Sequence, residues 1–227
     1  CSKGLERGTL APMHRVLKEA WPEARGAVLS GPSFAADVAR GLPTAVTLAA
    51  SDPDEREAWL DRLSAATFRL YASDDLLGVE LGGAVKNVLA IACGISAGKG
   101  FGESAKAALV ARGFAEFKRF GLAMGAQRET LAGLSGLGDL VLTCNSVQSR
   151  NFSLGLALGQ GQDAAAYLRE QATVAEGAAT AAPLVDLARQ KGVEMPICEG
   201  VASILESKAS VDAVIEGLLN RPLKEDG

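Results

Sequence analysis

The chain has 227 residues, 48% of them hydrophobic, which is enough for two modest domains with a substantial buried core. The 27 acidic residues slightly outnumber the 23 basic ones and give a formal net charge of −4, which argues against sequence-independent binding of nucleic acid. Four widely separated cysteines and one histidine, His14, lack zinc-ligand spacing. We therefore expect no metal and a reducing compartment, by default the cytoplasm.

Short apolar runs alternate with helical patterns over the first third of the chain. Strands are predicted at residues 27–30, 44–50 and 68–71, and helices at residues 33–41 and 54–65. This alternation predicts an α/β unit built on a parallel sheet, of which three strands are only a part. We expect the other strands to lie before Cys1, because the chain starts without methionine and looks like the tail of a longer protein.

Helical periodicity rich in alanine and leucine replaces this alternation from residue 78 onward. Helices are predicted at residues 78–98, 103–125, 127–133, 136–143, 150–159, 163–171, 175–191, 197–206 and 210–219. Charged residues interrupt the most apolar run, so no membrane span is expected. The sequence therefore predicts two domains, an α/β part at residues 1–77 and an all-helical part at residues 78–227.

Lys86 is the first candidate for a catalytic residue. It lies in the middle of an apolar, glycine-punctuated helix, where a buried amine must find a partner, lose its proton or do chemistry. Burial lowers the pKa of a lysine and makes its amine able to exchange protons near neutral pH. The alternative is a side chain that snorkels to the surface from a partly exposed face.

Two later segments carry polar side chains suited to a ligand. Asp139 follows the glycine-rich residues 133–138, and its carboxylate can hold a substrate hydroxyl or the ammonium of Lys86, or can simply cap a helix. Residues 149–151 offer a hydroxyl, a guanidinium and an amide at the start of another predicted helix. They suit a phosphate or a carboxylate, whereas a solvated cap with a surface arginine is the alternative.

The first third of the chain adds a turn and a second lysine. Gly31 and Ser33 follow a presumed parallel strand and open a helix, which is where open α/β sheets bind ligands. Lys3 follows the expected end of an earlier strand, and two lysines near one site lower each other's pKa. Ordinary turn chemistry and an exposed chain start explain these residues equally well.

Taken together, these motifs resemble the bacterial NAD(P)-dependent glycerol-3-phosphate dehydrogenases. Eight motifs agree in order and spacing over essentially the whole chain: Ser2–Gly4, Gly31–Ala35, Glu80–Gly94, Ala107–Gly113, Gly133–Asp139, Thr143-Cys144, Ser149–Asn151 and Glu176-Gly177. The family's glycine-rich dinucleotide fingerprint is not among these residues. The resemblance implies that residues 1–77 are the C-terminal part of a Rossmann-like NAD(P)-binding domain. Residues 78–227 would be a substrate-binding and catalytic domain of the 6-phosphogluconate dehydrogenase C-terminal type.

The resemblance implies hydride transfer with NAD or NADP that interconverts sn-glycerol 3-phosphate and dihydroxyacetone phosphate for phospholipid synthesis. Lys86 matches the family's proton acceptor, and Asn87 is expected to help orient the substrate. Substrate-binding positions are matched by Lys3, Gly31, Ser33, Lys86, Asp139, Ser149, Arg150 and Asn151. Cofactor contacts are matched by Lys3, Ala35, Arg150, Val174 and Glu176. A homodimer is the assembly considered, and these 227 residues alone are expected to have little activity.

Two other functions compete with this one. The first is a related dehydrogenase of the 6-phosphogluconate or ketopantoate type, which would share the architecture but act on another substrate. The second is a non-catalytic helical module that binds a phosphoester or mediates dimerisation, and that would tolerate loss of Lys86 and Asp139.

Overall fold

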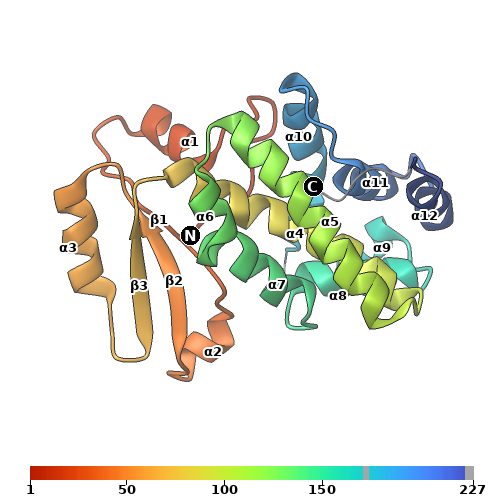
Figure 1. The fold of residues 1–227 in the computed structure, drawn as a ribbon, viewed down its shortest axis with the longest axis horizontal. Coiled ribbons are helices and arrows are strands. Elements are labelled where there is room, and N and C mark those ends of the chain that lie inside the picture. Colours follow the sequence, from red (N-terminus) through yellow and green to blue (C-terminus); the bar gives the residue numbers. More distant parts are fainter. Residues whose placement is uncertain (171–173, 223–227) are drawn as a thin grey trace.

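The computed structural model describes residues 1–170 and 174–222, and consists of a small sheet beside a bundle of helices (Figure 1). The strands β1 (Val28–Ser30), β2 (Thr44–Ala49) and β3 (Phe68–Ser73) form the sheet in the order β1-β2-β3. β2 and β3 run parallel, with Thr44 opposite Phe68. The predicted fold class, an α/β part followed by an all-helical part, is confirmed.

One detail of the predicted sheet is wrong, because β1 runs antiparallel to β2, with Val28 opposite Ala49. Between these strands lies only the short helix α2 (Ala35–Ala39). A parallel connection must cross over the sheet, usually through a full α-helix. The five residues of α2 are too few for this, so the chain turns back beside β1. The strand that ends at Ser30 is therefore not a parallel strand.

Two further helices lie in the first third of the chain, and α3 (Pro53–Leu63) packs against β2 and β3. α3 begins with proline at its first position, and the side chain of Asp52 accepts a hydrogen bond from the Glu55 amide at 3.0 Å. α1 (Met13–Ala20) was not predicted; it is amphipathic, yet none of its residues is buried. It is tied to the bundle through Glu80, which accepts hydrogen bonds from the backbone amide of His14 at 2.8 Å and pairs with its ring at 2.5 Å.

The bundle is built around one long helix, α4 (Leu76–Gly98), in which all residues from Gly78 to Ser96 are buried. The other helices are α5 (Gly102–Met124), α6 (Arg128–Ala132), α7 (Asp139–Cys144), α8 (Arg150–Gly159), α9 (Ala164–Glu170), α10 (Glu176–Gln190), α11 (Pro196–Leu205) and α12 (Val211–Leu219). A single π-helical turn, η1 (Leu134–Gly138), precedes α7. The predicted helices match these bounds within a few residues, although the last residue of the helix predicted at 163–171 lies outside the described residues.

α4 contacts α5, α7, α8, α10 and α11, and Figure 1 shows it running through the middle of the bundle behind α5. It is long and apolar enough to cross a membrane, but 89% of its apolar window is buried inside the protein. It is therefore the core helix of the bundle. Its closest neighbour is α8: a Cβ atom on Gly94 would lie 2.1 Å from the carbonyl oxygen of Phe152, and one on Gly155 would lie 2.0 Å from that of Ile91. The two backbones thus touch directly.

Candidate active site

The middle of α4 presents Lys86 to the start of α7. The Lys86 side chain is 8% exposed, and its Nζ atom lies 2.5 Å from Oδ2 of Asp139. The same ammonium donates a hydrogen bond to Oγ1 of Thr143 at 3.2 Å, and Thr143 in turn donates to Oδ1 of Asp139 at 3.1 Å. The snorkelling alternative is therefore wrong for Lys86. The alternative that Asp139 only caps a helix is also insufficient, because its carboxylate pairs with the Lys86 amine.

A second amine reaches the same carboxylate from the start of the chain. Nζ of Lys3 lies 3.6 Å from Oδ2 of Asp139, and the Lys3 side chain is 21% exposed. Its aliphatic stem lies against Gly83 of α4, where a Cβ atom would come within 3.2 Å of Lys3 Cγ. Gly83 precedes Lys86 by one turn on the same face of the helix. Lys3, Lys86 and Asp139 thus form one cluster, which reaches the surface through Lys3.

The environment of Lys86 changes its proton affinity. Burial away from water lowers its pKa from 10.5 to about 8, opposed by the charge of Asp139 and assisted by the charge of Lys3. Burial is the largest of these effects. The amine can therefore act as a base in its neutral form and as an acid in its charged form close to neutral pH.

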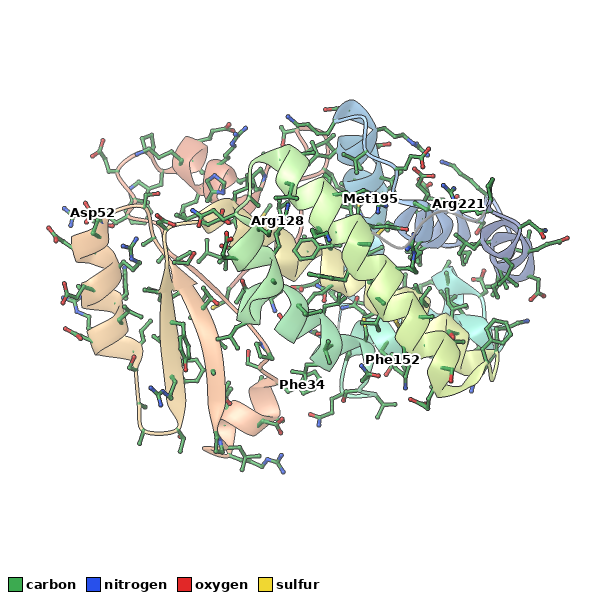
Figure 2. All side chains as sticks on the ribbon, viewed as in Figure 1. Phe34, Asp52, Arg128, Phe152, Met195 and Arg221 are labelled. Atoms are coloured by element: carbon green, nitrogen blue, oxygen red, sulfur yellow. The ribbon has the colours of Figure 1, made fainter. Side chains whose placement is uncertain are left out.

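The turn after β1 lies beside this cluster. Gly31 has a φ of +155°, and a Cβ atom there would lie 2.8 Å from the Cα atom of Val46, so only glycine fits without a backbone shift. Ser33 closes the turn by donating a hydrogen bond to the Gly31 carbonyl at 3.2 Å. Pro32 lies against Gly138, the residue before Asp139, with 3.7 Å between its Cγ atom and a Cβ atom built on Gly138. Phe34, next in the chain, is labelled in Figure 2 at the border between sheet and bundle.

Three further predicted residues meet on the neighbouring face of α4. Nδ2 of Asn87 donates a hydrogen bond to Oε2 of Glu176 at 3.4 Å, and Oδ1 of Asn151 accepts one from the Gly177 amide at 2.8 Å. A Cβ atom on Gly177 would lie 2.6 Å from the Asn87 carbonyl oxygen, so the starts of α8 and α10 converge on this turn of α4. This second cluster adjoins the first, because Asn87 follows Lys86 directly.

The remaining predicted residues lie outside these two clusters. Ser149 caps α8 by accepting a hydrogen bond from the Phe152 amide at 3.2 Å. Ala35 and Arg150, each the first residue of a helix, are exposed, as is Val174. Within the described ranges, no hydrogen bond or ion pair joins Ala35, Arg150 or Val174 to Lys86. These three positions are accessible to a ligand that approaches from outside.

Sequence reasoning missed the part of Thr143 in the site, although the Thr143-Cys144 pair was recognised as a motif. A signal for it existed, since Asp139 and Thr143 are four residues apart and so share one face of a helix. It also missed Ser30, whose buried hydroxyl lies 3.3 Å from a Cβ atom built on Gly83. No sequence pattern marks that contact, because it joins a strand end to a helix more than fifty residues later.

Comparison with known proteins identifies the family of the chain. Two family models match, the NAD-dependent glycerol-3-phosphate dehydrogenase C-terminus over residues 75–216 and its N-terminus over residues 1–56. A glycerol-3-phosphate dehydrogenase (NAD(P)+) of Maricaulis maris is 60% identical over 98% of this chain and 67% of its own length. Its counterpart from Parvibaculum lavamentivorans is 58% identical over 100% of this chain and 68% of its own length.

Solved structures lead to the same family. The crystal structure of glycerol-3-phosphate dehydrogenase from Coxiella burnetii superimposes with a TM-score of 0.92 at 42% identity, covering 96% of this chain and 67% of that one. The structure of glycerol-3-phosphate dehydrogenase GPD1 from Saccharomyces cerevisiae superimposes with a TM-score of 0.83 at 25% identity. This match covers 95% of this chain and 66% of that one. The resemblance seen in the sequence motifs is thus confirmed, and the chain belongs to the NAD-dependent glycerol-3-phosphate dehydrogenase family.

Proposed function

We propose that the protein interconverts sn-glycerol 3-phosphate and dihydroxyacetone phosphate, with NAD or NADP as the hydride carrier. The observation that carries this proposal is the buried pair of Lys86 and Asp139, 2.5 Å apart, in a chain of this family. Its cellular role would be the supply of glycerol 3-phosphate for phospholipid synthesis. Nothing in the comparisons favours a related dehydrogenase or a non-catalytic module.

Lys86 is proposed as the acid and base of the reaction. In the oxidation of the alcohol, the neutral amine accepts the hydroxyl proton while the hydride leaves C2. In the reduction of the ketone, the ammonium gives a proton to the C2 oxygen. The nicotinamide, when bound, takes or supplies the hydride. A pKa of about 8 supports both roles, because both forms of the amine are populated close to neutral pH.

Asp139 and Thr143 are proposed to hold the amine in position, and Lys3 to add positive charge. Two amines against one carboxylate leave the cluster attractive to an anionic substrate when both amines are charged. We assign the other substrate contacts to Gly31, Ser33, Ser149, Arg150 and Asn151, with Asn87 orienting the substrate from the next position of α4. A charged phosphate suits Arg150 and the free amides at the start of α8.

The residues proposed to contact the cofactor are Lys3, Ala35, Arg150, Val174 and Glu176. They fit a large ligand, because Ala35, Arg150 and Val174 are exposed and Lys3 is partly exposed. Glu176 lies next to the reacting groups through its hydrogen bond to Asn87. The chain spans about two thirds of the length of the relatives it matches. The 227 residues do not include a glycine-rich loop that would bind the pyrophosphate of the cofactor.

We further propose two domains, residues 1–77 and residues 78–227. The end of the sheet at Ser73 and the start of α4, where Asp75 accepts a hydrogen bond from the Gly78 amide at 2.7 Å, support a boundary here.

The free, buried thiols of Cys93, Cys144 and Cys198 support a reducing compartment such as the cytoplasm. A homodimer is proposed as the assembly, which sedimentation of the purified protein would test.

The function is tested with the full-length enzyme and a panel of substrates. We expect oxidation of NADH or NADPH that depends on dihydroxyacetone phosphate, and reduction of the nicotinamide that depends on glycerol 3-phosphate. The two related activities are assayed in parallel with 6-phosphogluconate and ketopantoate. Faster turnover of either of these substrates would replace the proposed function by the corresponding one.

A further inference from the structure

Ser30 carries a polar group that the structure leaves without a partner. It is the last residue of β1, it is 6% exposed, and its Oγ atom has no hydrogen-bond partner among the described residues. Buried hydroxyls are normally hydrogen-bonded, because an unpartnered one loses its contacts with water and gains nothing in return. This hydroxyl therefore requires an explanation, such as a ligand that supplies the missing partner.

The hydroxyl is placed at the amine cluster. A Cβ atom on Gly83 would lie 3.3 Å from Ser30 Oγ and 3.2 Å from Lys3 Cγ, so Ser30 and the stem of Lys3 lie together over the same point of α4. Lys86 follows one turn later on that face of the helix, and pairs with Asp139. Because residue 83 is glycine, the space between these groups is not filled by a side chain of α4.

The chemistry around Ser30 narrows the choice of ligand group. The amines of Lys3 and Lys86 suit an anion or a reacting oxygen, whereas a serine hydroxyl is uncharged and can both donate and accept a hydrogen bond. The proposed ketone substrate has three polar parts: a phosphate, the reacting C2 oxygen and one free hydroxyl on C1. Ser30 suits the third, because its uncharged hydroxyl has no partner among the described residues and lies beside the stem of Lys3.

We infer that Ser30 is a substrate-positioning residue whose hydroxyl binds the C1 hydroxyl of the three-carbon phosphate. The inference rests on the proposed function. It adds a residue of β1 to the site, next to the turn that carries Gly31 and Ser33. The bond it describes holds the end of the substrate opposite the phosphate, so that C2 is fixed from both sides in front of Lys86.

The test compares two ketones in the full-length enzyme, dihydroxyacetone phosphate and acetonyl phosphate, which lacks the C1 hydroxyl. We expect Ser30→Ala to lower kcat/KM for dihydroxyacetone phosphate by about 10-fold or more, as for the loss of one hydrogen bond, while kcat/KM for acetonyl phosphate changes little. The preference of the enzyme for the first ketone therefore falls by about the same factor. The thermal midpoint should stay the same or rise, because the alanine buries no unpartnered hydroxyl.

Ser135→Ala is the matched control. Ser135 is 1% exposed and its Oγ atom likewise has no partner among the described residues, but the residue lines a separate cleft of about 710 Å³ between β2, β3 and α6. We expect its substitution to leave the preference between the two ketones unchanged. Ser30→Cys, which keeps the shape but weakens the hydrogen bond, should give the same change in preference as Ser30→Ala if the alanine variant does not fold.

Three results would overturn the inference. The first is an unchanged preference in folded Ser30 variants. The second is an equal loss for both ketones together with a raised KM for NAD(P)H, which would make Ser30 a cofactor contact. The third is an equal change in preference in Ser135→Ala. If the unsubstituted enzyme reduced neither ketone, the proposed function itself would fail, and this outcome is distinguishable from the other three.

Discussion

Asp139 and Thr143 stand one helical turn apart on α7, and both contact the amine of Lys86. Because Thr143 also donates to the carboxylate of Asp139, the two side chains fix each other as well as the amine. The Lys86 side chain is long and flexible, and its position in the site is set by this pair. The consequences of that arrangement are testable in the full-length enzyme.

Lys86→Ala should lower kcat by a factor of about 10² to 10⁴, as expected for the loss of a general acid and base, with a smaller effect on substrate binding. Steady-state kinetics in both directions measure this. Lys99→Ala is the matched control, since Lys99 caps the end of the same helix and pairs with the exposed Asp212. Unfolding curves for both variants show whether they fold, and normal turnover in Lys86→Ala would remove Lys86 from the mechanism.

The two directions of the reaction should respond oppositely to pH. In the proposed mechanism, oxidation of glycerol 3-phosphate uses neutral Lys86, so its rate should rise as pH increases through about 8. Ketone reduction uses the ammonium, so its rate should fall over the same range. Since the charge of Lys3 lowers the pKa of Lys86, Lys3→Ala should shift both profiles to higher pH. Profiles of kcat measured from pH 6 to pH 10 provide the check, and a shift to lower pH in Lys3→Ala would contradict this account.

Thr143→Val keeps the shape of the side chain but removes both of its hydrogen bonds, to Lys86 and to Asp139. We expect kcat to fall by about 10-fold, with KM changed less, because the amine loses a contact that orients it. Thr143→Ser retains the hydroxyl and should restore most of the activity. A valine variant with normal kcat, or a serine variant as slow as the valine one, would argue against this role.

Glu116 should make stability depend on pH. It is buried in α5, and its two oxygens accept hydrogen bonds from the amides of Ile197 at 2.8 Å and Cys198 at 3.3 Å, at the start of α11. Burial is the main reason that its pKa rises from 4.5 to about 7. Between these values the folded state keeps a proton that the unfolded state releases, so the free energy of unfolding should fall by about 3 kcal/mol as pH rises from 4.5 to 7.

Urea unfolding at a series of pH values measures this dependence. Glu116→Gln, which cannot ionise, should flatten the slope between pH 4.5 and pH 7. Glu103→Gln, at an exposed position of the same helix, should leave the slope unchanged. A slope that persists in Glu116→Gln would assign the effect to other groups.

Much of the bundle was predictable because its helices are long segments rich in alanine and leucine, and α4 is apolar all round as a central helix should be. The direction of β1 was not predictable, since an apolar run of three residues does not indicate which way the strand runs in the sheet. α1 was missed although its polar and apolar residues separate onto two faces, and the pair between His14 and Glu80 that ties it to the bundle has no local signal in the sequence.

Some contacts of the candidate site could likewise be predicted from the sequence, and others could not. The pairing of Asp139 with Lys86 was one of the alternatives that the sequence offered, because a buried amine needs a counter-charge, and it is the one that the structure shows. Lys3 was expected near Lys86 only from a strand that precedes it. The approach of Ser30 to Gly83 depends on how β1 lies over α4, and this is decided by packing between elements rather than by either segment alone.

The direct contact of the α4 and α8 backbones at Gly94 and Gly155 bears on substrate size. At Gly94 and Gly155 no side chain separates the two backbones, so no rotamer change at these points can alter the distance between the helices. One helix carries the amine of Lys86, and the other begins with the polar residues 149–151. If Lys86 transfers the proton and residues 149–151 bind the phosphate, as proposed, main-chain contact fixes the distance between these two groups, and a phosphorylated alcohol longer by one carbon should be a poor substrate.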